Sequence, residues 1–134
     1  MTIREALGAL LVNKAAASTI AGTVLFTVYG QIVLKWQMSQ AGDLPAGFGP
    51  GIQFVLRQLA NPWIMSGFVA AALAALCWLA ALSNFDLSFA YPFMASSFAL
   101  VLVLSALLLG EDLTVGKVVS VAFVCVGLII GSLL

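Results

Sequence analysis

Four long apolar runs, divided by charged residues, are the main feature of the chain. No charged residue falls within four stretches, 15–34, 58–85, 87–110 and 118–134. Each is close to or above the length of about 20 residues that an α-helix needs to cross a hydrocarbon core of about 30 Å. The runs are too continuous for the alternating strands of a membrane barrel. The pattern predicts four transmembrane helices, near residues 15–38, 62–84, 88–109 and 115–133.

The connections between these helices differ in length. Residues 84–87 and 110–114 are short, so each must join two antiparallel neighbours. The connection 39–61 is longer, and its stretch from Ala41 to Gly51 is rich in Gly and Pro and is predicted not to be helical. An amphipathic stretch follows, and its apolar residues that share one helical face are Ile52, Val55, Leu56 and Leu59. This stretch is predicted to lie at the membrane interface, with an irregular loop as the alternative.

The segment before the first span is short. Residues 1–14 hold one apolar patch, interrupted by Asn13 and Lys14. We expect no cleaved signal peptide there, because nothing like a cleavage site precedes the first span. The segment is interpreted as an interfacial helix or as an extension of that span. The whole chain, 1–134, is expected to form one transmembrane domain. Cys77 and Cys125 fall within spans and are interpreted as small buried hydrophobes rather than as a disulfide.

Composition supports a membrane protein and narrows the possible functions. Hydrophobic residues make up 63% of the chain and charged residues 7%, against roughly 25% charged in a soluble domain. Five basic residues balance five acidic ones, so no field attracts nucleic acid. The chain has no histidine, the commonest metal ligand and proton shuttle. No nucleophile–base pair is evident, and we expect neither an enzyme nor a metal or cofactor.

Orientation in the membrane is poorly determined by charge. Arg4 and Lys14 fall on one side of the predicted spans, and Lys35, Arg57 and Lys117 fall on the other. Two basic residues against three is too small a difference for the positive-inside rule to decide. Insertion in both orientations stays open.

The fourth span has features of a helix-packing surface. Gly127 and Gly131 form a GxxxG motif in an apolar helix, which lets two backbones approach closely. Four helices cannot easily enclose a polar pathway, so we expect an oligomer and interpret these glycines as a dimer contact. Packing between helices of one chain is the alternative.

Polar residues follow one side of the first helix. Thr23, Thr27, Gln31 and Lys35 recur every four residues, and at about 100° per residue they cover an arc of about 120°. Polar groups are costly in hydrocarbon, so this arc is predicted to face a cavity. Alternatively, the threonines bond their own helix and the Lys35 stem reaches the headgroups.

Tyr91 is a further candidate for the same cavity. It precedes Pro92, which cannot donate a hydrogen bond to Ser88, so the third helix is predicted to be loosened or kinked there. The Tyr91 hydroxyl is able to line a cavity beside this weak point. The alternative is an interfacial anchor.

Three short motifs resemble the drug/metabolite transporter superfamily. They are Tyr29-Gly30-Gln31-Ile-Val-Leu-Lys35, then Phe89-Ala90-Tyr91-Pro92, then Leu109-Gly110-Glu111. The chain is most similar to the four-helix small multidrug resistance-like branch, and within it to the subunits that flip aminoarabinose-phosphoundecaprenol. The resemblance covers roughly 20–38 and 62–132. It implies a bundle of that kind, multi-pass in the inner or plasma membrane, paired with a second copy or a homologue.

Two departures separate the chain from the drug exporters of this branch. Those members carry an essential glutamate in the first helix, and alignment of the motifs places Thr27 there. They also lack the long connection 39–61. Both departures favour a flippase for a polyprenyl-phosphate-linked sugar or a similar amphipathic lipid. Lys35 and Arg57 are expected to meet the phosphate, and Gln31, Thr27 and Tyr91 the sugar. A drug or small-solute exporter and an accessory subunit of a membrane glycosyltransferase are the alternatives.

Overall fold

A computed structural model of the protein describes residues 4–5, 8 and 14–133. Much of the predicted interfacial or extended segment, 1–14, therefore lies outside the described residues. The described chain is helical, and its elements are α2 (Lys14–Ala41), α3 (Phe48–Gln58), α4 (Pro62–Asn84), α5 (Leu87–Leu109) and α6 (Val115–Leu133). The four long helices agree closely with the predicted ones. The first continues three residues beyond its predicted end at residue 38.

Local chemistry explains where several helices begin and end. Asn61 precedes α4, and its side-chain oxygen accepts a hydrogen bond from the Trp63 amide at 2.9 Å. Pro62 follows as the first helical residue, where a missing N–H costs nothing. Gly110 ends α5 in the left-handed conformation, with φ of 68°. This turn lets the Glu111 amide donate to the Ser105 carbonyl at 3.2 Å, so the helix end positions Glu111.

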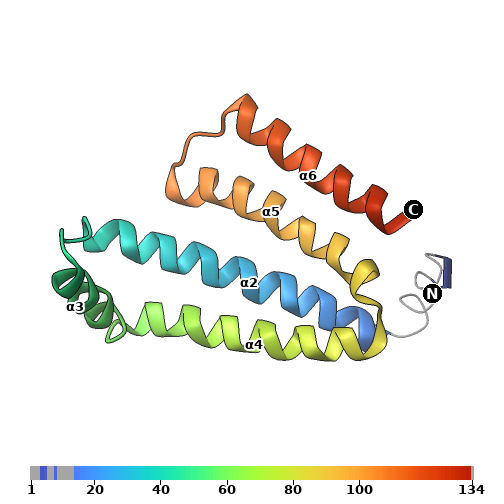
Figure 1. Ribbon diagram of the computed structural model, residues 1–134, viewed down its shortest axis with the longest axis horizontal. Helices are drawn as coiled ribbons and strands as arrows, with labels where there is room; N and C mark the ends of the chain where they lie inside the picture. The colour runs from blue at the N-terminus through green and yellow to red at the C-terminus, as the bar shows by residue number, and fades with distance from the viewer. Residues whose placement is uncertain (1–3, 6–7, 9–13, 134) are drawn as a thin grey trace.

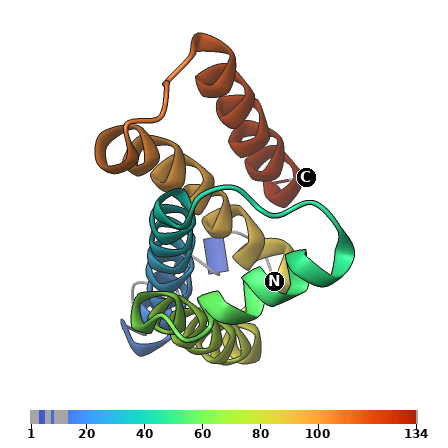
Figure 2. The same ribbon diagram turned by 90° about the vertical axis from the view of Figure 1, so that its left-hand side faces the viewer.

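The connection between α2 and α4 contains the helix α3. The amphipathic stretch is therefore helical, as predicted, and the irregular loop is not observed. The prediction that the whole of 41–51 is non-helical was wrong, because α3 begins at Phe48. Pro50 falls in the first turn, where its amide would have no partner in the helix. Gly47 precedes the helix with φ of 99°, which only glycine adopts readily. Figures 1 and 2 show α3 running across the end of the bundle rather than along it.

Helices α2 and α4 lie side by side and antiparallel along most of their length (Figure 1). Glycine permits the close approach, since a Cβ added to Gly30 would lie 3.1 Å from the Gly67 carbonyl oxygen. Tyr29 and Ser66 join the helices through a hydrogen bond of 3.0 Å between their hydroxyls. The Asn61 amide donates to Gln37 Oε1 at 2.8 Å. Small residues and polar pairs thus hold this pair of helices together.

A compact apolar cluster fixes the turn between α4 and α5. Its buried members are Ala16, Ile20, Ala81, Phe85, Phe89 and Ala90. They come from the start of α2, the end of α4 and the start of α5. The cluster holds α5 against α2 at this end of the bundle.

Helix α6 is the least enclosed element. It packs mainly on α5, and no residue between Val115 and Gly131 is buried. It runs roughly antiparallel to α5 (Figure 1). The helices α2, α4 and α5 are long and apolar enough to cross a membrane, whereas the apolar part of α6, Val115–Gly131, is shorter. Cys77 and Cys125 are half-buried free thiols.

Candidate functional site

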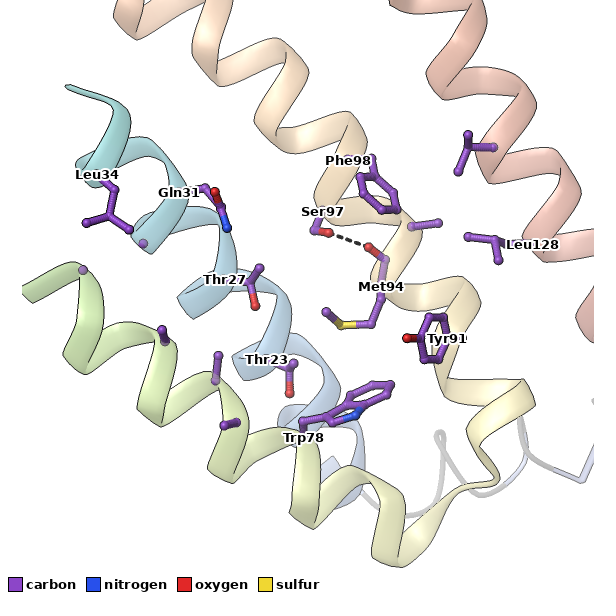
Figure 3. Close-up of a pocket in the computed structure, with 17 residues that line it drawn as sticks. Thr23, Thr27, Gln31, Leu34, Trp78, Tyr91, Met94, Ser97, Phe98 and Leu128 are labelled. Atoms are coloured by element: carbon purple, nitrogen blue, oxygen red, sulfur yellow. Dashed lines mark hydrogen bonds between the residues drawn. The ribbon is translucent and has the colours of Figure 1, made fainter. Parts of the chain in front are cut away.

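A cavity of about 680 Å³ lies between α2, α4, α5 and α6. Helix α2 contributes Thr23, Thr27 and Gln31, and α5 faces them with Tyr91 and Ser97 (Figure 3). The rest of the lining is largely apolar. Its members are Gly30, Leu34, Gly67, Ala71, Ala74, Ala75, Trp78, Met94, Ala95, Phe98, Val124 and Leu128. The prediction that the polar arc of the first helix faces a cavity is therefore confirmed for these three α2 residues.

A second cavity, of about 500 Å³, continues the first toward the other end of α5. The two share lining residues from both α2 and α5, namely Thr27, Gln31, Ser97 and Phe98. The second cavity ends at Glu111 and Lys117. We call the two cavities together the α2–α5 groove. It follows α5 from Tyr91 to Glu111, and a helix of that length spans about 30 Å, the thickness of a hydrocarbon core.

The polar side chains in the groove are of two kinds. Some bond their own helix, such as Thr23, whose hydroxyl donates to the Thr19 carbonyl at 2.8 Å, and Ser97, which donates to Met94 at 2.6 Å. The side-chain polar groups of Thr27, Gln31 and Tyr91 form no hydrogen bond within the part of the chain that the structure describes. These three groups are therefore available to a bound molecule, and all three were predicted from sequence.

Charge is confined to one end of the groove. Of the described residues that line it, the charged ones are Glu111 and Lys117. Lys35 does not line either cavity, but its Nζ lies 3.8 Å from Glu111 Oε1. The Lys117 ammonium donates to the Asp112 carbonyl at 2.7 Å. The end of α2 and the α5–α6 connection thus form a charged mouth, which we define by Lys35, Glu111 and Lys117.

Arg57 is not brought together with the other predicted residues. It lies on α3, is exposed, and lines neither cavity of the groove. The apolar residues of α3 line a separate cavity of about 330 Å³, which includes Phe48, Ile52 and Val55. Phe48 is 85% exposed. Such an apolar face beside the bundle end is typical of a helix at the membrane interface.

Several groove residues were missed by sequence reasoning. Trp78 lines the end opposite the charged mouth, and its ring lies edge-on to that of Tyr91 with centroids 5.8 Å apart. Ser97 and Ser105 line the wall on α5, and both are buried. A signal for the serines existed, because polar residues eight positions apart share a helical face. No such sequence signal existed for Trp78, since α4 is apolar on nearly all sides.

The two glycines of α6 do not pack closely within the chain. They border a shallow cavity of about 380 Å³ next to Pro92. A Cβ added to Gly127 or Gly131 would meet nothing within 4 Å. The alternative in which these glycines pack helices of one chain is therefore not supported. The space beside them is open, and residues at the start of α5 border it.

Long apolar helices around a groove with uncharged polar groups define a multi-pass membrane protein. No protein-family model matches the chain, and no solved structure matches it significantly. Curated relatives do match. The probable 4-amino-4-deoxy-L-arabinose-phosphoundecaprenol flippase subunit ArnF of Aeromonas salmonicida is 33% identical over 113 residues, covering 83% of this chain and 74% of that protein. The protein of the same name from Erwinia tasmaniensis is 35% identical over 114 residues, covering 81% and 87%.

A third relative of the same name, from Pseudomonas fluorescens, is 33% identical over 111 residues, covering 81% of this chain and 80% of its own. The chain belongs to the family of 4-amino-4-deoxy-L-arabinose-phosphoundecaprenol flippase subunits. The resemblance drawn from the motifs around Gln31, Tyr91 and Glu111 is thereby confirmed at the level of the family.

Proposed function

We propose that this chain is a subunit of a flippase that moves a polyprenyl-phosphate-linked sugar between the leaflets of the inner membrane. In this proposal α2, α4, α5 and α6 all cross the membrane, in the manner of the small multidrug resistance-like branch. The α2–α5 groove carries the proposal. It extends for about the thickness of a hydrocarbon core, and unpaired hydroxyl and amide groups line its middle.

The groove suits the headgroup of an amphipathic lipid. Hydroxyls of a sugar in hydrocarbon need hydrogen-bond partners, because each unpaired polar group is costly there. Thr27, Gln31 and Tyr91 have free polar groups that can supply them. The lining is otherwise mostly apolar, and α6 packs mainly on α5. The polyprenyl tail would remain in the surrounding lipid while the sugar moves along the groove.

Basic residues at one end of the bundle would hold the phosphate. Lys35 is 61% exposed at the charged mouth, and Arg57 is exposed on α3. A charge-assisted hydrogen bond to a phosphate is stronger than a neutral one. Lys35 is the nearer candidate, because its partner Glu111 itself lines the groove.

A second subunit would complete the groove, in a homodimer or with a homologue. The exposed large side chains on α6 include Phe123, Val124 and Val126, and Gly127 and Gly131 leave its surface open. Close backbone approach at such glycines drives helix association in membranes. The partner would cover the side of the groove that α6 leaves exposed.

A drug-exporting function is less well supported. Thr27 occupies the position of the exporters' glutamate, and the middle of the groove holds no carboxylate among the residues described. Proton-for-cation exchange by the mechanism of those exporters would lack its carrier.

Leaflet exchange in proteoliposomes tests the proposal. The protein, purified from its native membranes with any bound partner, should exchange a labelled polyprenyl-phosphate sugar. Lys35→Gln should slow this exchange about ten- to a hundredfold, because a charge-assisted contact is lost. Lys14→Gln is the matched control at the other end of α2 and should behave as the wild type. Unchanged exchange in Lys35→Gln would contradict the phosphate role. A strict need for a proton gradient would favour the exporter.

A further inference from the structure

Glu111 is a carboxylate at the groove that the proposed phosphate and sugar contacts do not use. It follows the left-handed Gly110, and its amide is tied to the Ser105 carbonyl. Its side chain lines the groove and is 39% exposed. The backbone turn therefore holds a negative group at the one charged end of an otherwise uncharged path.

Glu111 is already paired, but weakly. Its Oε1 lies 3.8 Å from Lys35 Nζ, which is near the limit of an ion pair, and both side chains are partly exposed. Exposed ion pairs of this kind contribute little to stability. The pair also joins two separate elements, the end of α2 and the α5–α6 connection. A ligand that offers a better partner to each charge can therefore replace it at little cost.

We propose that Glu111 selects a sugar that carries an amino group. This inference rests on the proposed flippase function. The names of the relatives specify a 4-amino sugar joined through phosphate to a polyprenol. Such a headgroup has a cationic ammonium and an anionic phosphate. Glu111 would leave Lys35 and pair with the ammonium of the sugar. The freed Lys35 would pair with the phosphate.

The exchange preserves charge balance at the membrane. An unpaired charge is costly to desolvate, whereas two crossed pairs leave no charge alone. One carboxylate and one lysine, already neighbours, match one ammonium and one phosphate. A neutral sugar in the same place would satisfy Lys35 but would leave Glu111 without its cation. The preference for an amino sugar thus follows from the Glu111 carboxylate, which a neutral sugar leaves without a partner.

Two lipids separate this role from the transport function itself. One is a polyprenyl-phosphate 4-amino sugar, and the other is the same lipid with its amine acetylated. The wild-type protein should exchange the amine lipid faster. Glu111→Gln should slow the amine lipid about ten- to a hundredfold. It should not slow the acetylated lipid and should raise its rate toward that of the amine lipid, because no carboxylate is then left without a cation. Glu111→Asp, which keeps the charge, should retain part of the preference.

Two further variants serve as controls. Asp112→Asn removes the neighbouring carboxylate, which lines neither cavity of the groove, and should keep the wild-type preference. Lys35→Gln should slow both lipids, because both carry the phosphate. Equal exchange of the two lipids by the wild type, or an equal loss of both in Glu111→Gln, would overturn the amine role alone. Exchange of neither lipid by the wild type would overturn the proposed function.

A carbodiimide crosslink gives a second test that does not depend on transport. The reagent joins a carboxylate to a nearby amine as an amide with loss of water. Without lipid it should couple Lys35 to Glu111, as read by mass spectrometry of the joined peptides. The amine lipid should lower that yield and become attached at Glu111, whereas the acetylated lipid should not. A Lys35–Glu111 yield that the amine lipid leaves unchanged would contradict the exchange.

Discussion

The two helix pairs of this protein, α2–α4 and α5–α6, differ in how they are held together. Helix α2 has eight buried residues, including Thr23 and Gln37, and it meets α4 through glycine contacts and hydrogen-bonded polar pairs. Helix α6 has no buried residue in its described part up to Gly131. Both pairs are built from apolar helices, so apolar content alone does not decide which helices pack.

Small residues and polar pairs account for the difference. Lipid tails are as apolar as leucine, so burial of apolar surface does not drive helices together in a membrane. Close backbone contact and interhelical hydrogen bonds do, and α2–α4 has both. Helix α6 carries Gly127 and Gly131, but within the described chain no atom lies within 4 Å of where their Cβ would be. The first pair therefore provides a rigid wall for the groove, and the second leaves a surface for a partner.

The largest expected effect is on the glycine contact of the rigid wall. Gly30→Leu would place side-chain atoms against the Gly67 carbonyl, where even a Cβ lies 3.1 Å away. Overpacking of this kind costs typically 1–3 kcal/mol, and we expect a loss of about 3 kcal/mol here. Equilibrium unfolding in mixed micelles measures it, followed by the fluorescence of Trp36 and Trp63, whose rings contact each other across this interface. Wild-type stability in Gly30→Leu would refute the close packing of α2 and α4.

The corresponding change on α6 should affect association instead of folding. Gly127→Leu combined with Gly131→Leu fills space that is open within the chain, so the free energy of unfolding of the monomer should not fall. If these glycines contact a partner, the dissociation constant of the oligomer should rise about tenfold or more. Crosslinking and mass photometry in detergent report the oligomer. An unchanged oligomer would place the interface elsewhere, and an unstable monomer would show that these two glycines pack closely within the chain.

Two single-hydroxyl changes provide the smallest and most closely matched comparison. Tyr29→Phe removes the hydrogen bond between α2 and α4 and should cost about 0.6 kcal/mol of stability, without slowing transport. Thr27→Val removes a hydroxyl that faces the groove without a protein partner. It should leave stability unchanged and slow lipid exchange about two- to tenfold. Slower exchange in Tyr29→Phe together with lower stability in Thr27→Val would contradict the division between the rigid wall and the groove.

Much of the helical arrangement was predictable from sequence, for a clear reason. Charged residues are excluded from hydrocarbon, so their positions delimit the spans to within a few residues. The polar arc was predictable because Thr23, Thr27 and Gln31 stand out on an apolar helix. The start of α3 was not, because Pro50 and its neighbouring glycines usually break helices. In the first turn they do not, since those amides have no helical partner in any case.

The assembly of the groove depended on tertiary contacts. Helix α4 is apolar around nearly its whole circumference, so periodicity assigns it no inner face. The position of Trp78 at the end opposite the charged mouth therefore could not be inferred. Lys35 and Glu111 are far apart in sequence, and their pairing depends on where α5 ends relative to α2. The spans and the polar stripe could be predicted because the free-energy cost of placing a residue in hydrocarbon depends on the type of that residue. The cavity, its charged mouth and the open face of α6 depend on how glycines and hydrogen bonds bring particular helices together.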